Sequence, residues 1–174
     1  LFFEGSAHVP LLIMPPQGRS LPQNISVEAP ADLVDLYPTI LAMAGLSSPV
    51  SVSGKNLLEP VPMDRMFFGN SLNKNFCVME EKVKLVYSAV GDHVLLFDLN
   101  TDPMEQHNLA EDPAWQERKA KLWKLLLEHT AQYTPEALDE KGQFLTYEAP
   151  HFPGDVPGRW FGFHYHDYSV DTFH

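Results

Sequence analysis

Hydrophobic residues follow three different patterns along the chain. Residues 9–16 form an apolar run closed by two prolines, which is typical of a strand buried on both faces of a parallel sheet. Such a strand needs neighbours, and the surrounding sequence supplies few, so we expect the chain to be part of something larger. Residues 35–44 carry apolar side chains at helical spacing and end at Gly45, which predicts a short helix beginning near Asp35 or Leu36.

The pattern changes to short β-rich segments between residues 65 and 99, separated by turn-forming residues. Their close spacing favours hairpins, so we predict a four-stranded antiparallel meander. Asp112 and Pro113 then begin a helix that runs to about Gln132 and covers one face of this sheet. Its apolar stripe consists of Trp115, Leu122, Leu125, Leu126 and His129.

Composition removes several classes of protein from consideration. With 12 basic against 23 acidic residues and a net charge of −11, the chain is a poor partner for nucleic acid. No apolar run approaches the roughly 18 residues of a membrane span, so we expect no membrane partner and a soluble chain. The sequence leaves the compartment open between the periplasm and the cytoplasm of a bacterium. The single cysteine, Cys77, excludes a disulfide framework and a cysteine-based zinc site, and is interpreted as a small buried hydrophobe.

Three phrases occur in order over residues 1–133: FEGSAHVPLLIMPP, LVDLYPTILAMAGL and KLVYSAVGDHVLLFDLNTDPMEQHNLAED. In their order and spacing they resemble the C-terminal portion of the sulfatase family, in particular arylsulfatase-like members. The resemblance implies an α/β chain that is the C-terminal part of the sulfatase and alkaline phosphatase-like fold. In that fold, a four-stranded antiparallel sheet is packed by a long helix, as the patterning predicts.

The resemblance also implies a division of the chain. Residues 1–62 are expected to be the end of the catalytic α/β domain, with a strand, a loop and a helix. Residues 63–133 would form the antiparallel subdomain with its helix, and residues 134–174 a tail rich in aromatic residues and histidine that wraps over a surface. We therefore expect the C-terminal portion of a formylglycine-dependent sulfuric ester hydrolase that acts on sulfate esters.

The nucleophile motif of that family, C/S-x-P-x-R, does not occur in the chain. Cys77 lies in CVMEE, and the Ser47 phrase SSPVS has Ser51 in place of the arginine. The acidic calcium ligands have no counterpart either. Calcium and formylglycine are thus implied only for a complete enzyme, with no catalytic, cofactor-binding or metal-binding residue expected in this chain, which should be inactive alone.

Three histidines are candidates for substrate binding: His8, His164 and His166. His8 stands where the family usually has arginine, so it could donate to the sulfate or to the leaving group, or simply be a loop histidine bonded to backbone. Glu4 reads as a structural acid, or else as a calcium ligand or base. On a strand, His164 and His166 would share a face with Asp167 nearby, which suits a metal site, the mouth of a substrate pocket, or plain surface packing.

Two other functions stay open at this point. The chain could be a non-catalytic module whose tail, with Arg159 and Trp160, mediates homo-oligomerisation. A threonine in the nucleophile's place would instead indicate a phosphodiesterase or phosphotransferase relative of the same superfamily. Asp35 and Thr39 are interpreted as helix-start residues without a catalytic role.

Overall fold

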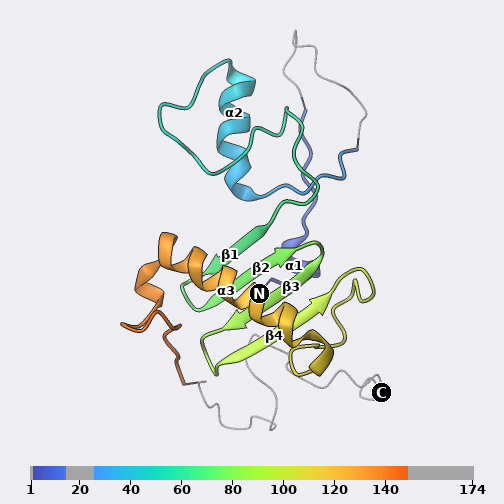
Figure 1. The fold of residues 1–174 in the computed structure, drawn as a ribbon. Coiled ribbons are helices and arrows are strands. Elements are labelled where there is room, and N and C mark those ends of the chain that lie inside the picture. The colour runs from blue at the N-terminus through green and yellow to red at the C-terminus, as the bar shows by residue number, and fades with distance from the viewer. Residues whose placement is uncertain (1, 15–25, 149–174) are drawn as a thin grey trace, which may run out of the picture. The chain divides into compact units, whose positions relative to one another are not determined.

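The computed structural model describes residues 2–14 and 26–148 and divides the chain into two compact units (Figure 1). The first unit joins Leu1–Val9 to Met66–His174, and the second is Pro10–Arg65. The first residues of the chain therefore belong with the sheet that follows 60 residues later.

A four-stranded antiparallel sheet forms the centre of the first unit. The strands are β1 (Phe67–Ser71), β2 (Asn75–Glu80), β3 (Val83–Ser88) and β4 (His93–Asp98), in the order β1-β2-β3-β4. Val78 pairs with Leu85, and Leu85 with Leu96, which aligns large apolar side chains across three strands. Glu81 and Lys82, with φ of 51° and 63°, form the two-residue turn of the hairpin β2–β3. The predicted meander is confirmed.

One face of the sheet is covered by α3 (Gln116–Tyr133), which crosses the strands in Figure 1. Its start is as predicted: the Asp112 side chain accepts a hydrogen bond from the Ala114 N–H at 2.9 Å, and Pro113 follows the cap. Leu122 and Leu126 are fully buried against the sheet. Among the described residues, no helix is both long and apolar enough to cross a bilayer.

An aromatic cluster extends this core. Tyr87 of β3 lies at the centre, with its ring centroid 4.9 Å from that of Trp123 and 4.7 Å from that of Phe144. Phe144 follows the short 3-10 helix η3 (Pro135–Ala137), so the first part of the tail packs on its own sheet. The tail residues from 149 onward lie outside the described part of the chain.

The opposite face of the sheet is covered by the N-terminal segment, which includes the single turn α1 (Glu4–Ala7). The Phe3 ring lies 5.9 Å from that of Phe97, centroid to centroid. Phe2 lies over Gly69, where an added Cβ would come within 2.5 Å of its ring. The apolar residues beneath the two rings are Cys77, Val86, Leu95 and Phe97.

The second unit contains the 3-10 turn η1 (Leu33–Asp35) and α2 (Leu36–Ala44). The helix has the predicted bounds, with Pro38 in its first turn, where a missing N–H costs nothing. Gly45 ends it with φ of 74°, a left-handed conformation that glycine adopts without strain.

The expected strand over residues 9–16 is not present in this chain: residues 9–14 have no regular secondary structure and are exposed, and residues 15 and 16 lie outside the described part. Leu12 is 93% exposed and Met14 87%. A strand forms only where a neighbour accepts and donates its backbone hydrogen bonds, and no described segment pairs with this one. The prediction is therefore wrong for the chain as it stands.

Candidate functional site

A buried lysine lies where the N-terminal segment meets the sheet. Lys84 belongs to β3, and its side chain is only 3% exposed. Its ammonium donates to the Phe2 carbonyl at 2.9 Å, to Oε1 of Glu105 at 2.8 Å, and to Oε1 of Glu4. An ammonium carries three donors and no acceptor, so Lys84 is fully satisfied. It anchors the N-terminal segment and has no donor left for a substrate.

Glu105 completes this anchor from the loop after β4. Its Oε2 accepts a hydrogen bond from the Glu4 backbone N–H at 2.6 Å, while Oε1 faces Lys84. The residue is buried and has a φ of 55°, which is uncommon outside glycine. Both carboxylate oxygens are thus used to hold the N-terminal segment and β3 together.

His8 lies at the outer end of the same cluster. Its Nδ1 is 2.9 Å from Oε2 of Glu4, and its side chain is 80% exposed. Burial raises the pKa of Glu4, but its hydrogen bonds to Lys84 and His8 and their charges outweigh this, so the pKa lies below its usual value. An ionised Glu4 therefore orients the imidazole, while most of the ring stays open to solvent.

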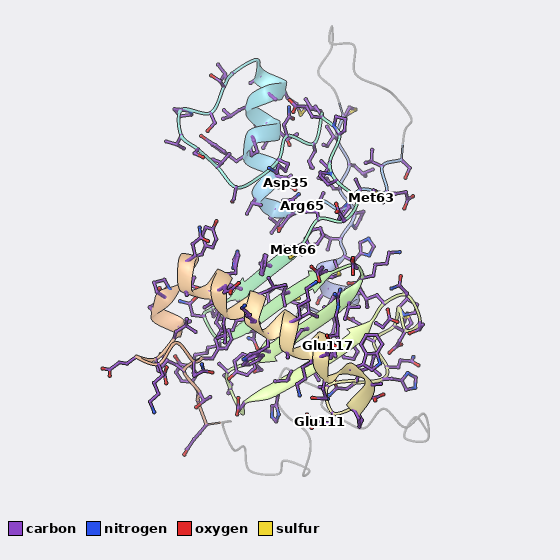
Figure 2. The ribbon with its side chains drawn as sticks, viewed as in Figure 1. Asp35, Met63, Arg65, Met66, Glu111 and Glu117 are labelled. Carbon is purple, nitrogen blue, oxygen red and sulfur yellow. The ribbon has the colours of Figure 1, made fainter. Side chains whose placement is uncertain are left out.

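The second unit has a separate polar cluster, in which Asp35 lies beside Arg65 (Figure 2). Asp35 is fully buried. Arg65 binds its carboxylate with both guanidinium nitrogens, at 2.5 and 2.9 Å, and the N–H groups of Lys55 and Asp32 donate at 2.7 and 2.8 Å. Burial raises the pKa of Asp35, but the hydrogen bonds from these donors and the charge of Arg65 outweigh this effect. The pKa of Asp35 therefore lies below its ordinary value. Asp35 has the structural role predicted for it, as does Thr39, which accepts from the Leu57 N–H.

These clusters do not fit a calcium ion. Calcium takes six to eight oxygen ligands, whereas the oxygens of Glu4, Glu105 and Asp35 already accept hydrogen bonds from the protein. Within residues 2–14 and 26–148, no three side chains of His, Cys, Asp or Glu are grouped as metal ligands.

Cys77 has the character of a core residue. It lies in β2, is 6% exposed, and packs with Val86 and Leu95 under the N-terminal segment. Burial in this apolar setting raises the pKa of its thiol to about 12, so the thiolate is not formed at neutral pH. The predicted role as a small buried hydrophobe is confirmed.

Of the three histidines predicted to bind substrate, the structure describes His8. His8 is bonded to the carboxylate of Glu4, and Glu4 binds a lysine ammonium. His164, His166 and Asp167 lie outside the described residues, so their role stays a prediction.

Sequence reasoning missed Lys84, Glu105 and Arg65. For Lys84 a signal exists: a single charge inside the strand VKLVYS must find a partner if the strand is buried on both faces. For Glu105 and Arg65 we find no local signal, because their partners are 21 and 30 residues away in sequence.

Comparison with known proteins gives one family and a set of relatives. The family profile described as N-sulphoglucosamine sulphohydrolase, C-terminal, matches residues 1–132. Arylsulfatase K of Bos taurus is 34% identical over 127 residues, which are 62% of this chain and 23% of that protein. Choline-sulfatase of Rhizobium meliloti (strain 1021) is 33% identical over 166 residues, 85% of this chain and 31% of that protein.

The aligned part of the chain thus spans 23% and 31% of the length of these two relatives. Solved structures are more distant. The phosphonate monoester hydrolase of Agrobacterium radiobacter is 26% identical with a TM-score of 0.44, over 62% of this chain and 27% of that one. A 2-O GAG sulfatase is 22% identical with a TM-score of 0.48, over 60% and 26%.

Proposed function

Because this chain belongs to the N-sulphoglucosamine sulphohydrolase C-terminal family, we propose that it is the C-terminal part of a sulfuric ester hydrolase. The observation that carries the proposal is the match over residues 1–132, supported by the alignment with choline-sulfatase over 85% of the chain. The α/β architecture, with its antiparallel sheet and long helix, agrees with a sulfatase C-terminal region.

In this proposal the chain has a structural role in the enzyme and does not supply the nucleophile. Residues 1–62 contribute to the end of the catalytic domain, residues 63–133 form the subdomain, and residues 134–174 wrap over a surface and serve any homo-oligomer contact. The C/S-x-P-x-R motif is absent from the sequence, and Cys77 is buried and protonated. The nucleophile and the metal ligands are then supplied by other polypeptide, and the 174 residues alone should not hydrolyse a sulfate ester.

The residue that this chain offers to the substrate is His8. Its ring is exposed, and one nitrogen is held by Glu4, which is itself fixed by the buried Lys84. A histidine held in this way can donate a hydrogen bond to a sulfate oxygen or a proton to the leaving oxygen. His164 and His166 complete the proposed rim of the pocket.

The coding sequence upstream of Leu1 tests the assignment directly. We expect an open reading frame that encodes C/S-x-P-x-R and acidic metal ligands, and hydrolysis of p-nitrophenyl sulfate by the complete polypeptide. A threonine at the nucleophile position, together with a preference for p-nitrophenyl phosphodiesters or phosphonates, would overturn it. Turnover by the purified 174-residue chain would contradict the proposed division of labour.

The role of His8 has a matched control within the same unit. His107 is also an exposed histidine beside an acid, with its Nδ1 3.6 Å from Oδ2 of Asp102. In the complete polypeptide, His8→Gln should lower kcat/KM for the sulfate ester by about a hundredfold or more, the usual contribution of an acid-base group. His107→Gln should leave it unchanged. Equal activity of the two variants would remove His8 from the site.

A further inference from the structure

The side chain of Glu4 joins a buried lysine to an exposed histidine. Its Oε1 accepts a hydrogen bond from the ammonium of Lys84, whose side chain is 3% exposed. Its Oε2 lies 2.9 Å from Nδ1 of His8, whose side chain is 80% exposed. Both oxygens of the carboxylate are therefore in use, and each has a different partner.

The backbone around α1 holds Glu4 and His8 close together. The His8 N–H donates to the Glu4 carbonyl at 3.0 Å, so the two residues are one helical turn apart and their side chains are neighbours. The Glu4 N–H donates to Oε2 of Glu105 at 2.6 Å. Glu4 is thus held by both its backbone and its side chain in the absence of substrate.

The charge of Glu4 decides which nitrogen of His8 carries the hydrogen. Burial raises the pKa of Glu4, but the hydrogen bonds and charges of Lys84 and His8 outweigh this effect, so the pKa lies below its usual value. An ionised carboxylate only accepts hydrogen bonds, so Nδ1 of His8 is the donor. Nε2 lies on the other side of the ring, away from Glu4, and carries a hydrogen only when the imidazole is charged.

We infer that Glu4 is a positioning residue that holds His8 in its Nδ1–H form, so that Nε2 is the nitrogen that meets the sulfate ester. This inference rests on the proposed function. As the sulfur–oxygen bond breaks, its electron pair stays on the leaving oxygen, which takes the proton from Nε2 of the charged ring. The sulfuryl group passes to an oxygen nucleophile, which in the net hydrolysis is water. The ring becomes neutral, and its Nδ1–H stays on Glu4 throughout.

Glu4→Gln in the complete polypeptide should reverse this arrangement. The Lys84 ammonium only donates, so it selects the amide oxygen of the glutamine and turns the amide NH2 towards His8. Nδ1 then has to accept, which favours the Nε2–H form of the ring. We expect kcat/KM for p-nitrophenyl sulfate to fall by about tenfold or more, because the histidine is held in the wrong tautomer. Asp102→Asn, which changes the acid beside the exposed His107, is the matched control and should leave kcat/KM unchanged.

Two further measurements separate positioning from a structural role. In the His8→Gln variant, adding Glu4→Gln should not change kcat/KM, because no ring is left to position. The second measurement is the ¹⁵N chemical shifts of the ring nitrogens in histidine-labelled wild-type protein, with His8 assigned by its absence in His8→Gln. At a pH where the ring is neutral, Nδ1 should be protonated in the wild type and Nε2 in Glu4→Gln.

A neutral His8 ring protonated at Nε2 in the wild type would overturn the inference, whether or not Glu4→Gln folds. An equal loss of kcat/KM from Glu4→Gln with and without His8 would also overturn it, since Glu4 would then act on the fold. A wild-type polypeptide that does not hydrolyse p-nitrophenyl sulfate defeats the proposed function. Hydrolysis that Glu4→Gln leaves unchanged defeats the positioning role alone.

Discussion

The ammonium of Lys84 lies 2.8 Å from Oε1 of Glu105, and both side chains are 3% exposed beneath the N-terminal segment. This pair connects β3 to the loop after β4, and through Glu4 it holds the first residues of the chain against the sheet. Removing one partner of such a pair leaves an uncompensated buried charge, which is more costly than the pair is favourable.

Lys84→Met should therefore lower the free energy of unfolding by about 3–5 kcal/mol, since Glu105 is left buried and unpaired. The measurement is urea unfolding followed by tryptophan fluorescence, which reports on Trp115 and Trp123 of the same unit. Lys124→Met, at an exposed position, should change it by less than about 0.5 kcal/mol. In Lys84→Met/Glu105→Gln the loss should be smaller than in the single variant, and an equal or larger loss would argue against the charge pair as its cause.

Gly69→Ala should loosen the N-terminal segment from the sheet. An added Cβ would lie 2.5 Å from the Phe2 ring, so the ring must move, at a cost of about 1–3 kcal/mol in stability. The same change at Gly5, where nothing lies within 4 Å, is the control. The double variant Gly69→Ala/Phe2→Leu should regain part of the loss in the same unfolding measurement, and no recovery would mean that the Phe2 contact is not responsible.

The stability of the second unit should depend on pH through Asp35. The pKa of this carboxyl is lower in the folded state than its ordinary value of 3.8, because Arg65 and backbone N–H groups outweigh the effect of burial. The ionised carboxylate therefore contributes fully above pH 3.8, and its contribution is lost as the pH falls through the lowered pKa.

Asp35→Asn should consequently lower stability at pH 7, by about 2–3 kcal/mol, and flatten the loss below pH 3.8. Thermal midpoints by far-UV circular dichroism between pH 2.5 and pH 7, roughly the range in which carboxylates titrate, give both quantities. Asp64→Asn, at an exposed acid one residue before Arg65, serves for comparison. If both variants show the wild-type dependence of the thermal midpoint on pH, the Asp35–Arg65 pair is not the cause of the loss of stability at low pH.

The thiol of Cys77 should be unreactive towards thiol reagents while the protein is folded. Its pKa is raised to about 12 by burial, and the strand position blocks access. Reaction with 5,5′-dithiobis(2-nitrobenzoic acid) at pH 8 should be complete in guanidinium chloride and slower by several orders of magnitude in buffer, as expected when reaction needs global opening. Rapid native labelling would contradict the packing of the N-terminal segment over β2.

Prediction from sequence succeeded where the deciding contacts are local. The bounds of α2 follow from Pro38 and Gly45, and the start of α3 follows from Asp112 and Pro113. The meander follows from short β-rich segments joined by tight turns, because neighbouring strands then pair without a long connection.

It failed where the deciding partner is distant. The apolar run at residues 9–14 reads as a buried strand, but a strand depends on neighbours that no single segment can specify. Glu4 was expected to be a structural acid, but the sequence did not indicate its partner, because Lys84 lies 80 residues further on.

The sequence by itself determined the family, the antiparallel sheet and the helices, because periodicity, caps and turn residues act within a few positions of one another. Only the tertiary structure decided that the N-terminal segment covers the second face of the sheet, and that Asp35 of η1 and Thr39 of α2 are buried while Tyr37 and Ile40 stay exposed. Both outcomes depend on hydrogen bonds and ion pairs between residues far apart in the chain, whose free energy exists only once the fold brings them together.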